Sequence, residues 1–182
     1  MSNEVLNSLL KEYEQKKLNA ELDLDRRKQN LYKLFVELSY NLLTTNGISS
    51  LIIQSSLMCD SSSQYTRELL LKNTTINHII EFPKIAPNPN GQLFKEALVA
   101  TCILMYSKNS PSSQHSFYLS ANNDLTTLNH FDFAIIPQQT PLKFYPNGYC
   151  FPLIREKDFS IIKKLNNETI FLGEIINTSS QG

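Results

Sequence analysis

Long hydrophobic runs are missing from this sequence of 182 residues. No apolar stretch approaches the roughly 20 residues that a membrane-spanning helix requires, and the acidic amino-terminal stretch lacks the apolar segment of a secretory signal. Glycine is scarce at 5 residues, and hydrophobic residues make up 41% of the chain, which excludes collagen-like and disordered classes. We therefore expect a soluble, cytoplasmic protein with one domain, or with one domain and part of a second.

The sequence also lacks an excess of charge of either sign. Its 17 Lys and Arg residues balance 17 Asp and Glu residues, so the formal net charge at pH 7 is +0. Bulk electrostatics therefore give no argument for a polyanionic partner, although a local basic patch is compatible with a neutral total. Basic side chains are denser in the last 40 residues than elsewhere, at Lys143, Arg155, Lys157, Lys163 and Lys164.

Several motifs that mark common chemistries are absent. The sequence has no glycine-rich phosphate loop, GxGxxG, HExxH or CxxC, which argues against the usual nucleotide, zinc-protease and redox sites. Ser55 and Ser56 follow an expected strand but lack the flanking glycines of a GxSxG nucleophile. The cysteines, Cys59, Cys102 and Cys150, are widely spaced and odd in number. This pattern favours reduced, mostly buried thiols over a disulfide set or a metal site.

The stretch around which the chain is organised covers residues 93–108. Its central part, residues 97–106, is apolar except for Thr101, and a polar run begins at Ser107. Such a run is typical of a strand that is buried on both faces. We expect the upstream strands to be its neighbours in a sheet.

Helices and strands alternate upstream of this strand. Apolar residues at helical spacing predict helices, and short apolar runs predict strands. The expected order is a helix within residues 4–29, a helix at 31–43, a strand at 48–53, a helix at 61–71 and a strand at 76–82. The pair Asn46-Gly47 is expected to end the helix at 31–43, since glycine tolerates the left-handed conformation, and the serines from Ser61 to cap the next helix. This alternation predicts a mostly parallel sheet whose last two strands, joined without a helix, are antiparallel.

The character of the chain changes after Pro111. Frequent prolines exclude long regular elements from there on. Short strands are expected at 116–119 and 132–136, a short helix at 156–165 and a final strand or turn at 169–176. We therefore divide the chain into an amino-terminal helical segment (1–30), an α/β region (31–111) and an irregular segment (112–182).

Five sequence blocks in order resemble a known family. They span residues 31–108 and read LYKLFVELSYNLL, NGISSLIIQSSL, YTRELLLKN, INHIIEF and LFKEALVATCILMYSK. They resemble the second half of the catalytic domain of gamma-type DNA methyltransferases specific for adenine N6, from type II restriction-modification systems. The resemblance implies an α/β fold with the last strands of a partial Rossmann-like methyltransferase sheet, the final pair being antiparallel. The tail, with FSIIKKL and LGEII, resembles the start of that family's target-recognition domain.

The resemblance implies a specific chemistry. The family transfers a methyl group from S-adenosylmethionine to adenine in double-stranded DNA, after flipping the base out of the duplex. Its glycine-rich cofactor loop and Asn-Pro-Pro-aromatic tetrad are absent here and would lie upstream of Met1. We therefore expect a fragment that has no catalytic or cofactor-binding residues, is inactive alone and needs a complementary chain carrying the amino-terminal half. Phe94 matches the family's aromatic residue that packs against the flipped base.

Two alternatives stay open at this point. Phe94 is equally compatible with filling core space beside Leu93. The whole chain is also compatible with a non-enzymatic DNA-binding or assembly subunit that uses its basic, proline-rich tail, with Lys163 and Lys164 as DNA contacts. The neutral net charge argues against strong non-specific DNA binding, because such binding scales with the phosphates neutralised.

Overall fold

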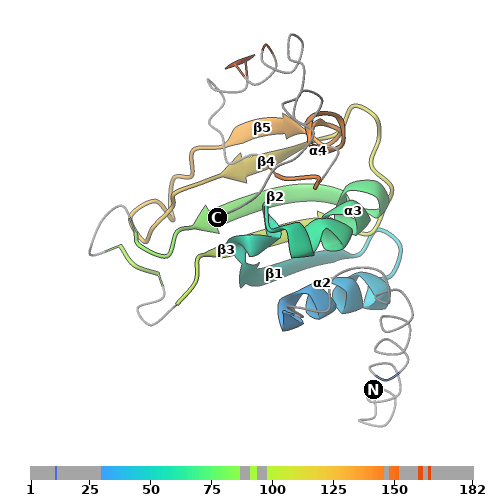
Figure 1. Cartoon of the computed structure of the whole chain (residues 1–182), viewed down its shortest axis with the longest axis horizontal. Helices are drawn as coiled ribbons and strands as arrows, with labels where there is room; N and C mark the ends of the chain where they lie inside the picture. The colour runs from blue at the N-terminus through green and yellow to red at the C-terminus, as the bar shows by residue number, and fades with distance from the viewer. Residues whose placement is uncertain are drawn as a thin grey trace, which may run out of the picture.

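The computed structural model describes residue 11 and residues 30–86, 91–93, 98–145, 148–151, 160–161 and 164. Helices and strands alternate in its first half, and short strands dominate its second half (Figure 1). The elements are α2 (Leu31–Leu42), β1 (Ile48–Gln54), η1 (Ser55–Leu57), η2 (Ser61–Ser63), α3 (Gln64–Asn73), β2 (Thr75–Phe82), β3 (Thr101–Ser107), β4 (Ser116–Ser120), β5 (Ala134–Pro137) and α4 (Thr140–Phe144).

The described strands form one mixed sheet in the order β1-β3-β2-β4-β5. Strand β3 is antiparallel to both β1 and β2, β2 is parallel to β4, and β5 is antiparallel to β4. Strands β1, β2 and β4 therefore run in the same direction. The α/β class with a partial Rossmann-like sheet is confirmed, and so is the antiparallel pairing of β2 with the strand that follows it. The prediction of a mostly parallel sheet is wrong, because β3 lies between β1 and β2 and only β2 and β4 pair in parallel among the described strands.

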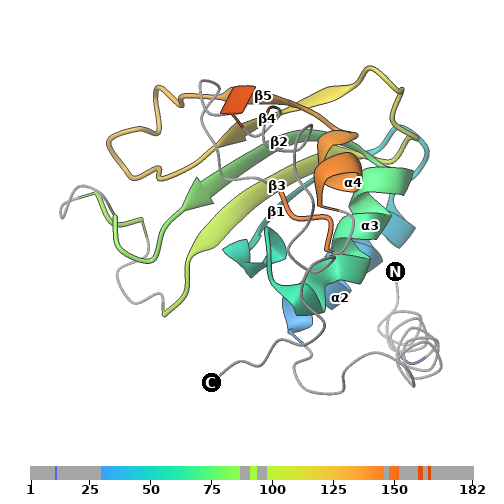
Figure 2. The ribbon, with the colours of Figure 1, turned by 45° about the horizontal axis from the view of Figure 1, so that its top comes forward.

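One face of the sheet carries the core. Figure 2 shows α2, α3 and α4 on the same side of the sheet. The strand register aligns Leu51, Leu104 and Ile79 on this face, and Leu104 and Ile79 are fully buried. The Tyr106 hydroxyl donates to the Val36 carbonyl at 3.1 Å, which ties β3 to α2. Burial of each large apolar side chain stabilises the fold by about 1.5–3 kcal/mol, so the helices are held chiefly by this layer.

The connections around α2 and α3 differ in detail from the sequence prediction. Helix α2 ends at Leu42, but Asn46 and not Gly47 adopts the left-handed conformation, with φ 62°. Before α3, the Asp60 carboxylate accepts the Ser62 backbone N–H at 2.8 Å and caps η2, whereas Ser63 makes no capping hydrogen bond with its side chain. The predicted helix and turn are present, but Asn46 adopts the left-handed conformation and Asp60 provides the cap.

The central strand is shorter and less buried than predicted. Strand β3 begins at Thr101 and not at residue 97, and Leu98 is 82% exposed. Along β3, fully buried residues alternate with half-buried ones, starting from Cys102 and Ile103. The prediction of burial on both faces is therefore wrong, because the described helices cover only one face of the sheet.

The second half of the chain extends the same sheet. Strands β4 and β5 lie close to the predicted ranges, and α4 was not predicted. The division near residue 112 stays a prediction, although β4 pairs directly with β2. Of the helix predicted within residues 4–29 only Lys11 is described, and of the one at 156–165 only residues 160, 161 and 164; the strand or turn at 169–176 lies outside the described residues.

Candidate functional site

Three strands end at a common edge of the sheet, which we call the carboxyl edge. Strands β1, β2 and β4 run in one direction and end there at Gln54, Phe82 and Ser120. In Figure 1 this edge faces left, where the long connections leave the sheet. Ligands of open α/β sheets bind outside the carboxyl ends of the strands. A ligand-binding site is therefore expected at the carboxyl edge.

Two connections lock together at the carboxyl edge. The Leu125 N–H donates to the Gly91 carbonyl at 2.8 Å. A Cβ atom at Gly91 would come within 2.7 Å of the Asp124 Cγ atom, so only glycine fits this contact. The Asp124 side chain is itself held, because its Oδ1 accepts the Thr126 N–H at 2.8 Å. The connection after β2 is therefore anchored on the connection after β4.

Glu81 forms a second anchor at this edge. Its side chain is nearly buried, and its Oε2 atom accepts the Asn122 N–H at 2.7 Å. Its backbone carbonyl accepts the Asn123 backbone N–H at 3.1 Å and the Asn123 side-chain amide at 3.0 Å. Burial raises the pKa of Glu81, and the Asn122 hydrogen bond partly offsets this rise. Glu81 thus holds the connection after β4 in place.

The predicted base-stacking residue, Phe94, lies outside the described residues, but both ends of its loop are described. The loop is anchored before Phe94 at Gly91, as above. After Phe94, the Ala100 carbonyl accepts the Ser55 N–H at 3.0 Å, at the end of β1. The loop that contains Phe94 therefore begins and ends at the carboxyl edge.

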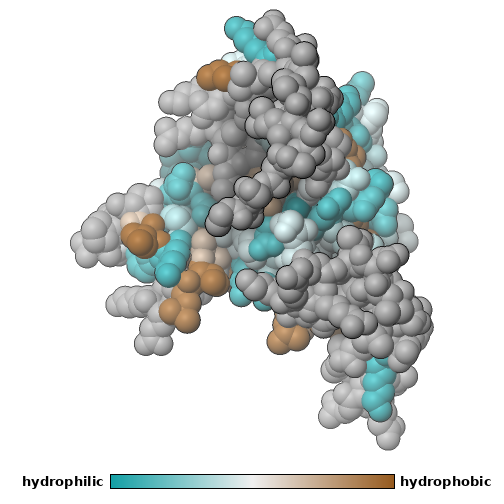
Figure 3. Space-filling view, viewed as in Figure 1, coloured by the Kyte–Doolittle hydropathy of each residue, from teal (hydrophilic) through white to brown (hydrophobic). Residues whose placement is uncertain are grey.

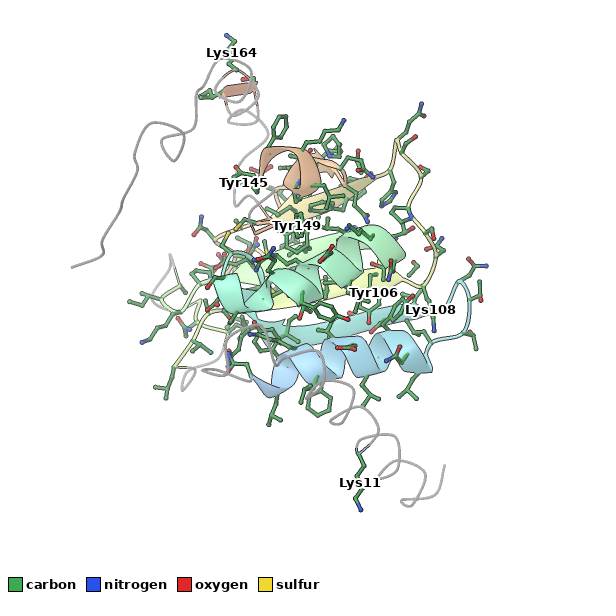
Figure 4. All side chains as sticks on the ribbon, turned by 45° about the vertical axis from the view of Figure 1, so that its right-hand side comes forward. Lys11, Tyr106, Lys108, Tyr145, Tyr149 and Lys164 are labelled. Carbon is green, nitrogen blue, oxygen red and sulfur yellow. The ribbon has the colours of Figure 1, made fainter. Side chains whose placement is uncertain are left out.

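Of the two predicted DNA contacts only Lys164 is described, and it is not brought to this edge. Lys163 lies outside the described residues, and Lys164 is exposed. Figure 4 shows Lys164 well away from the sheet and from Tyr106 in its core. The structure therefore gives Lys164 no contact with the carboxyl edge.

The face of the sheet opposite the helices is a feature that the sequence prediction missed. We call it the open face, because no described helix covers it. Ile48 and Ile52 are exposed by 66% and 63%, and Ile135 by 49%. None of the described strand residues in register on this face is Lys, Arg, Asp or Glu. The large side chains of the open face are Ile48, Ile52, His78, Ile80, Phe82, Ile103, Met105, Tyr118 and Ile135.

Aromatic rings cluster at one side of the open face. His78 stacks on Tyr118 with ring centroids 5.2 Å apart, and Phe133 meets both rings edge-on. Within the described residues, the buried Nδ1 atom of His78 has no hydrogen-bond partner. A flat apolar and aromatic surface of this kind suits contact with another protein element better than contact with phosphate groups.

The outer side of α2, on the helix-covered side of the sheet, also exposes apolar side chains, and β1 has a free edge. On α2, Leu31 is 70% exposed and Phe35 is 59% exposed. Figure 3 shows apolar atoms emerging beside this helix. Strand β1 pairs with β3 on one side and is the terminal strand among those described. An unpaired strand edge offers a row of N–H and C=O groups to another chain.

The described residues contain neither a membrane-spanning helix nor a metal-binding cluster. No helix among them is long and apolar enough to cross a membrane. No group of three or more His, Cys, Asp and Glu side chains within this part of the chain is placed to hold a metal ion.

The chain is similar to known proteins in two respects: its first half matches a family model, and part of it resembles several solved structures. Residues 2–86 match the family model of the Eco57I restriction-modification methylase. No curated protein matches the chain. The solved type IIG restriction endonuclease BpuSI is 24% identical, covering 48% of this chain and 10% of its own, with a TM-score of 0.37. The M protein of the type I restriction enzyme EcoKI is 14% identical, covering 50% of this chain and 19% of its own, with a TM-score of 0.41.

A third solved structure is a putative class I S-adenosylmethionine-dependent methyltransferase from Listeria monocytogenes. It is 20% identical, covering 59% of this chain and 32% of its own, with a TM-score of 0.43. The chain thus spans between 10% and 32% of the length of these three proteins. The resemblance carried by the five sequence blocks is confirmed by this match: residues 2–86 of the chain are similar to the Eco57I restriction-modification methylase family.

Proposed function

We propose that this chain is the carboxyl-terminal part of a site-specific DNA methyltransferase acting on adenine N6, and that it works only with a complementary chain. The observation that carries the proposal is the combination of an antiparallel β3 between β1 and β2 with an outer edge of β1 that has no described partner. A sheet of this kind has room for further strands beside β1. The complementary chain supplies them together with the cofactor loop and the catalytic tetrad.

The open face supports the same proposal. In α/β folds both faces of the sheet are covered by helices, because strands with apolar residues on both faces bury both. Here Ile52 and Ile135 leave apolar area in water on the face without described helices. Burial of that area contributes about 25 cal/mol per Å², so covering the face favours assembly. We assign the cover to helices of the complementary chain.

The described residues do not fit a site for S-adenosylmethionine on this chain alone. A nucleoside cofactor in an open α/β sheet is held by a glycine-rich turn and by a carboxylate that binds the ribose hydroxyl. At the carboxyl edge, the Glu81 and Asp124 carboxylates both accept backbone N–H groups of the connection after β4. We therefore place the cofactor on the complementary chain and assign no step of methyl transfer to the described residues.

The chain's own contribution in this proposal is to hold the DNA base. Phe94 lies in a loop whose ends are anchored at the carboxyl edge through Gly91 and Ala100. A base flipped out of the duplex is held by stacking on aromatic rings. We propose that Phe94 provides this stacking contact for the target adenine, and that residues 112–182 lead into a target-recognition region.

The test begins with the DNA upstream of the Met1 codon. The proposal expects it to encode, within about 200 codons, a glycine-rich loop and an Asn-Pro-Pro-aromatic tetrad, since the upstream part of one domain has roughly this length. The two chains are then co-expressed, and methyl transfer from labelled S-adenosylmethionine to double-stranded DNA is measured. Activity is expected from the pair and from neither chain alone. Unrelated upstream sequence, or a complex without activity, would contradict the proposal.

A second candidate function is a non-enzymatic assembly or DNA-binding subunit. The uncharged open face favours assembly, because it lacks the cations that bind phosphate. DNA binding by this subunit would depend on Lys163 and Lys164 in the tail. An assembly role without methyl transfer is the outcome expected if the co-expressed partner binds but adds no cofactor site.

A further inference from the structure

Two cysteines that lie 91 positions apart in the sequence meet beside the turn that precedes α3. The Phe151 N–H donates to the Met58 carbonyl at 2.9 Å and joins the two segments. The Cys59 thiol donates to the Phe151 carbonyl at 3.6 Å, and the Cys150 thiol donates to the Cys59 carbonyl at 3.7 Å. Each thiol therefore lies against the backbone of the other segment.

The two thiols also influence each other directly. Cys59 is exposed as a residue, but partial burial of its sulfur and the neighbouring Cys150 thiol raise its pKa to about 11. Arg67 acts in the opposite direction on this pKa. The two hydrogen bonds between the segments place the thiols beside each other, and Cys59 is the exposed residue of the pair.

Arg67 links the segment around Cys59 to the segment around Cys150. Its side chain is fully buried, and its Nε atom donates to the Gly148 carbonyl at 2.7 Å. Its Nη1 atom donates to the Leu57 carbonyl at 2.9 Å and to the Asp60 carbonyl at 2.8 Å. One guanidinium therefore fixes the backbone on both sides of the cysteine pair. Figure 4 shows Tyr149 close to α3 in this view.

One nitrogen of this buried guanidinium is left over. Within the described residues, Arg67 Nη2 is buried and has no hydrogen-bond partner. A Cβ atom placed on Gly148 would lie 3.7 Å from this Nη2 and 3.7 Å from the Cys150 sulfur, so the two atoms border the same small space. An unpaired buried donor is costly, and a negatively charged sulfur or its oxidised form beside it relieves that cost. Arg67 is therefore placed to stabilise a negatively charged or oxidised sulfur at these thiols.

We propose that Cys59 and Cys150 are a redox-active pair, which closes into a disulfide on oxidation and fixes residues 148–151 to the turn before α3. This inference does not depend on the proposed methyltransferase function. It revises the expectation of three independent reduced thiols, which the distance between the cysteines along the chain had favoured. The oxidant is a peroxide, and hydrogen peroxide is the probe.

The reaction proceeds in two balanced steps. In the fraction of chains in which Cys59 is ionised, which grows as the pH approaches its raised pKa, the thiolate sulfur attacks one oxygen of hydrogen peroxide. The O–O bond breaks, and the departing hydroxide takes up a proton to give water and a sulfenic acid. The Cys150 sulfur then attacks the sulfenic sulfur and displaces hydroxide, which leaves as water with the Cys150 proton. The two sulfurs together lose two electrons, and the peroxide is reduced to two molecules of water.

Cys102 provides the matched control within the same chain. It is fully buried on the helix-covered face of β3, and burial raises its pKa to about 12. A fully buried thiol of this kind is inert, because peroxide in the solvent does not reach its sulfur, whereas Cys59 is exposed. It is expected to stay reduced while the Cys59–Cys150 pair reacts.

The experiment treats the full chain with hydrogen peroxide, alkylates remaining thiols, digests without reduction and identifies linked peptides by mass spectrometry. We expect a Cys59–Cys150 link within the monomer, its loss on adding a reductant, and a melting temperature several degrees higher in the oxidised chain. Cys59→Ser and Cys150→Ser each abolish the link and the temperature shift, whereas Cys102→Ser leaves both unchanged. Sulfinic acid at Cys59 with a free Cys150, or disulfide-linked dimers in place of the intramolecular link, would overturn the proposal.

Arg67 is tested as a positioning residue. Arg67→Lys keeps the charge but cannot serve three carbonyls with a planar fork. We expect the rate of the intramolecular link to fall by at least about tenfold and the share of Cys59 sulfinic acid to rise, because misplaced reacting atoms slow such steps strongly. An unchanged ratio of disulfide to sulfinic acid contradicts this role. If this variant does not fold, the cysteine variants alone decide the proposal.

Discussion

Gly91 is a residue whose side chain, a single hydrogen atom, matters to the shape of the carboxyl edge. A Cβ atom there would lie 2.7 Å from Asp124 Cγ and 2.9 Å from Asp124 Cβ. Asp124 cannot move aside easily, because its Oδ1 accepts both the N–H and the hydroxyl of Thr126. We expect Gly91→Ala to lower the free energy of unfolding by about 1–3 kcal/mol, measured from the urea midpoint.

Gly148→Ala is the matched control for this prediction. A Cβ atom at Gly148 would meet its nearest atoms at 3.7 Å, which is ordinary van der Waals contact. We therefore expect the free energy of unfolding of this variant to lie within about 0.5 kcal/mol of that of the unmodified chain. Equal losses in the two variants would mean that the contact between Gly91 and Asp124 does not hold the connections together.

Glu81 makes stability depend on pH in a direction opposite to that of most carboxylates. Burial raises the pKa of Glu81 in the folded chain above its ordinary value of 4.5. Between the unfolded and the folded pKa, the folded chain binds more protons, so stability falls as the pH rises through this window. The contribution is fully present below pH 4.5 and lost above the folded pKa.

Glu81→Gln removes this dependence, because the amide oxygen still accepts the Asn122 N–H and does not titrate. We expect the urea midpoint of the unmodified chain to fall, relative to Glu81→Gln, as the pH rises from about 4.5 through the raised pKa. Glu37, whose pKa is also raised by burial, acts with the same sign in both proteins and cancels in the comparison. Parallel pH curves would show that Glu81 is not buried in the folded chain.

At the scale of the elements, two isoleucines on the strands that flank β3 distinguish the faces of the sheet. Ile79 is fully buried under the helices, whereas Ile52 on the open face is 63% exposed. We expect Ile79→Ala to cost about 2–5 kcal/mol through lost burial and a residual cavity, and Ile52→Ala to cost less than about 1 kcal/mol. Urea unfolding of the isolated chain at low concentration measures both. Similar losses in the two variants would mean that the open face is covered.

The same elements show what periodicity can and cannot predict. The predicted helix at 31–43 and strands at 48–53 and 76–82 are present, because each depends on local spacing and on local turn residues. The burial of β3 was overestimated, since an apolar run reports that a strand prefers burial and not whether helices cover both faces. The open face follows from the order of strands, which involves contacts between residues far apart in the sequence.

The candidate site was predictable only in part, for a related reason. Phe94 was assigned from its resemblance to a family, and the structure adds that its loop is anchored at Gly91 and Ala100. Arg67 gave no signal in the sequence, because its partners are backbone carbonyls at positions 57, 60 and 148. Backbone acceptors exist at every residue, so no pattern of side chains marks such a site.

For the whole molecule, the salt dependence of DNA affinity distinguishes a DNA-binding role from an assembly role. Each phosphate neutralised adds about 0.9 to the slope of log affinity against log salt on duplex DNA. If Lys163 and Lys164 contact DNA, the double substitution to Ala lowers this slope by about 2, measured by fluorescence anisotropy. Lys72→Ala is the control, since Lys72 is paired with Glu68 at 2.6 Å on α3. An unchanged slope in the double variant removes these lysines from the DNA contact.

Methyl transfer by the assembled pair of chains gives the most direct test of what this chain adds. Stacking on an aromatic ring contributes about 1–3 kcal/mol per base, which corresponds to a change of about 5-fold to 150-fold in rate or affinity. We expect Phe94→Ala to lower kcat/KM for DNA by this factor without weakening association of the two chains. Phe94→Tyr keeps the ring and should retain most of the activity. If Phe94 instead fills core space beside Leu93, Phe94→Ala destabilises the isolated chain, and urea unfolding separates that outcome from a loss confined to catalysis.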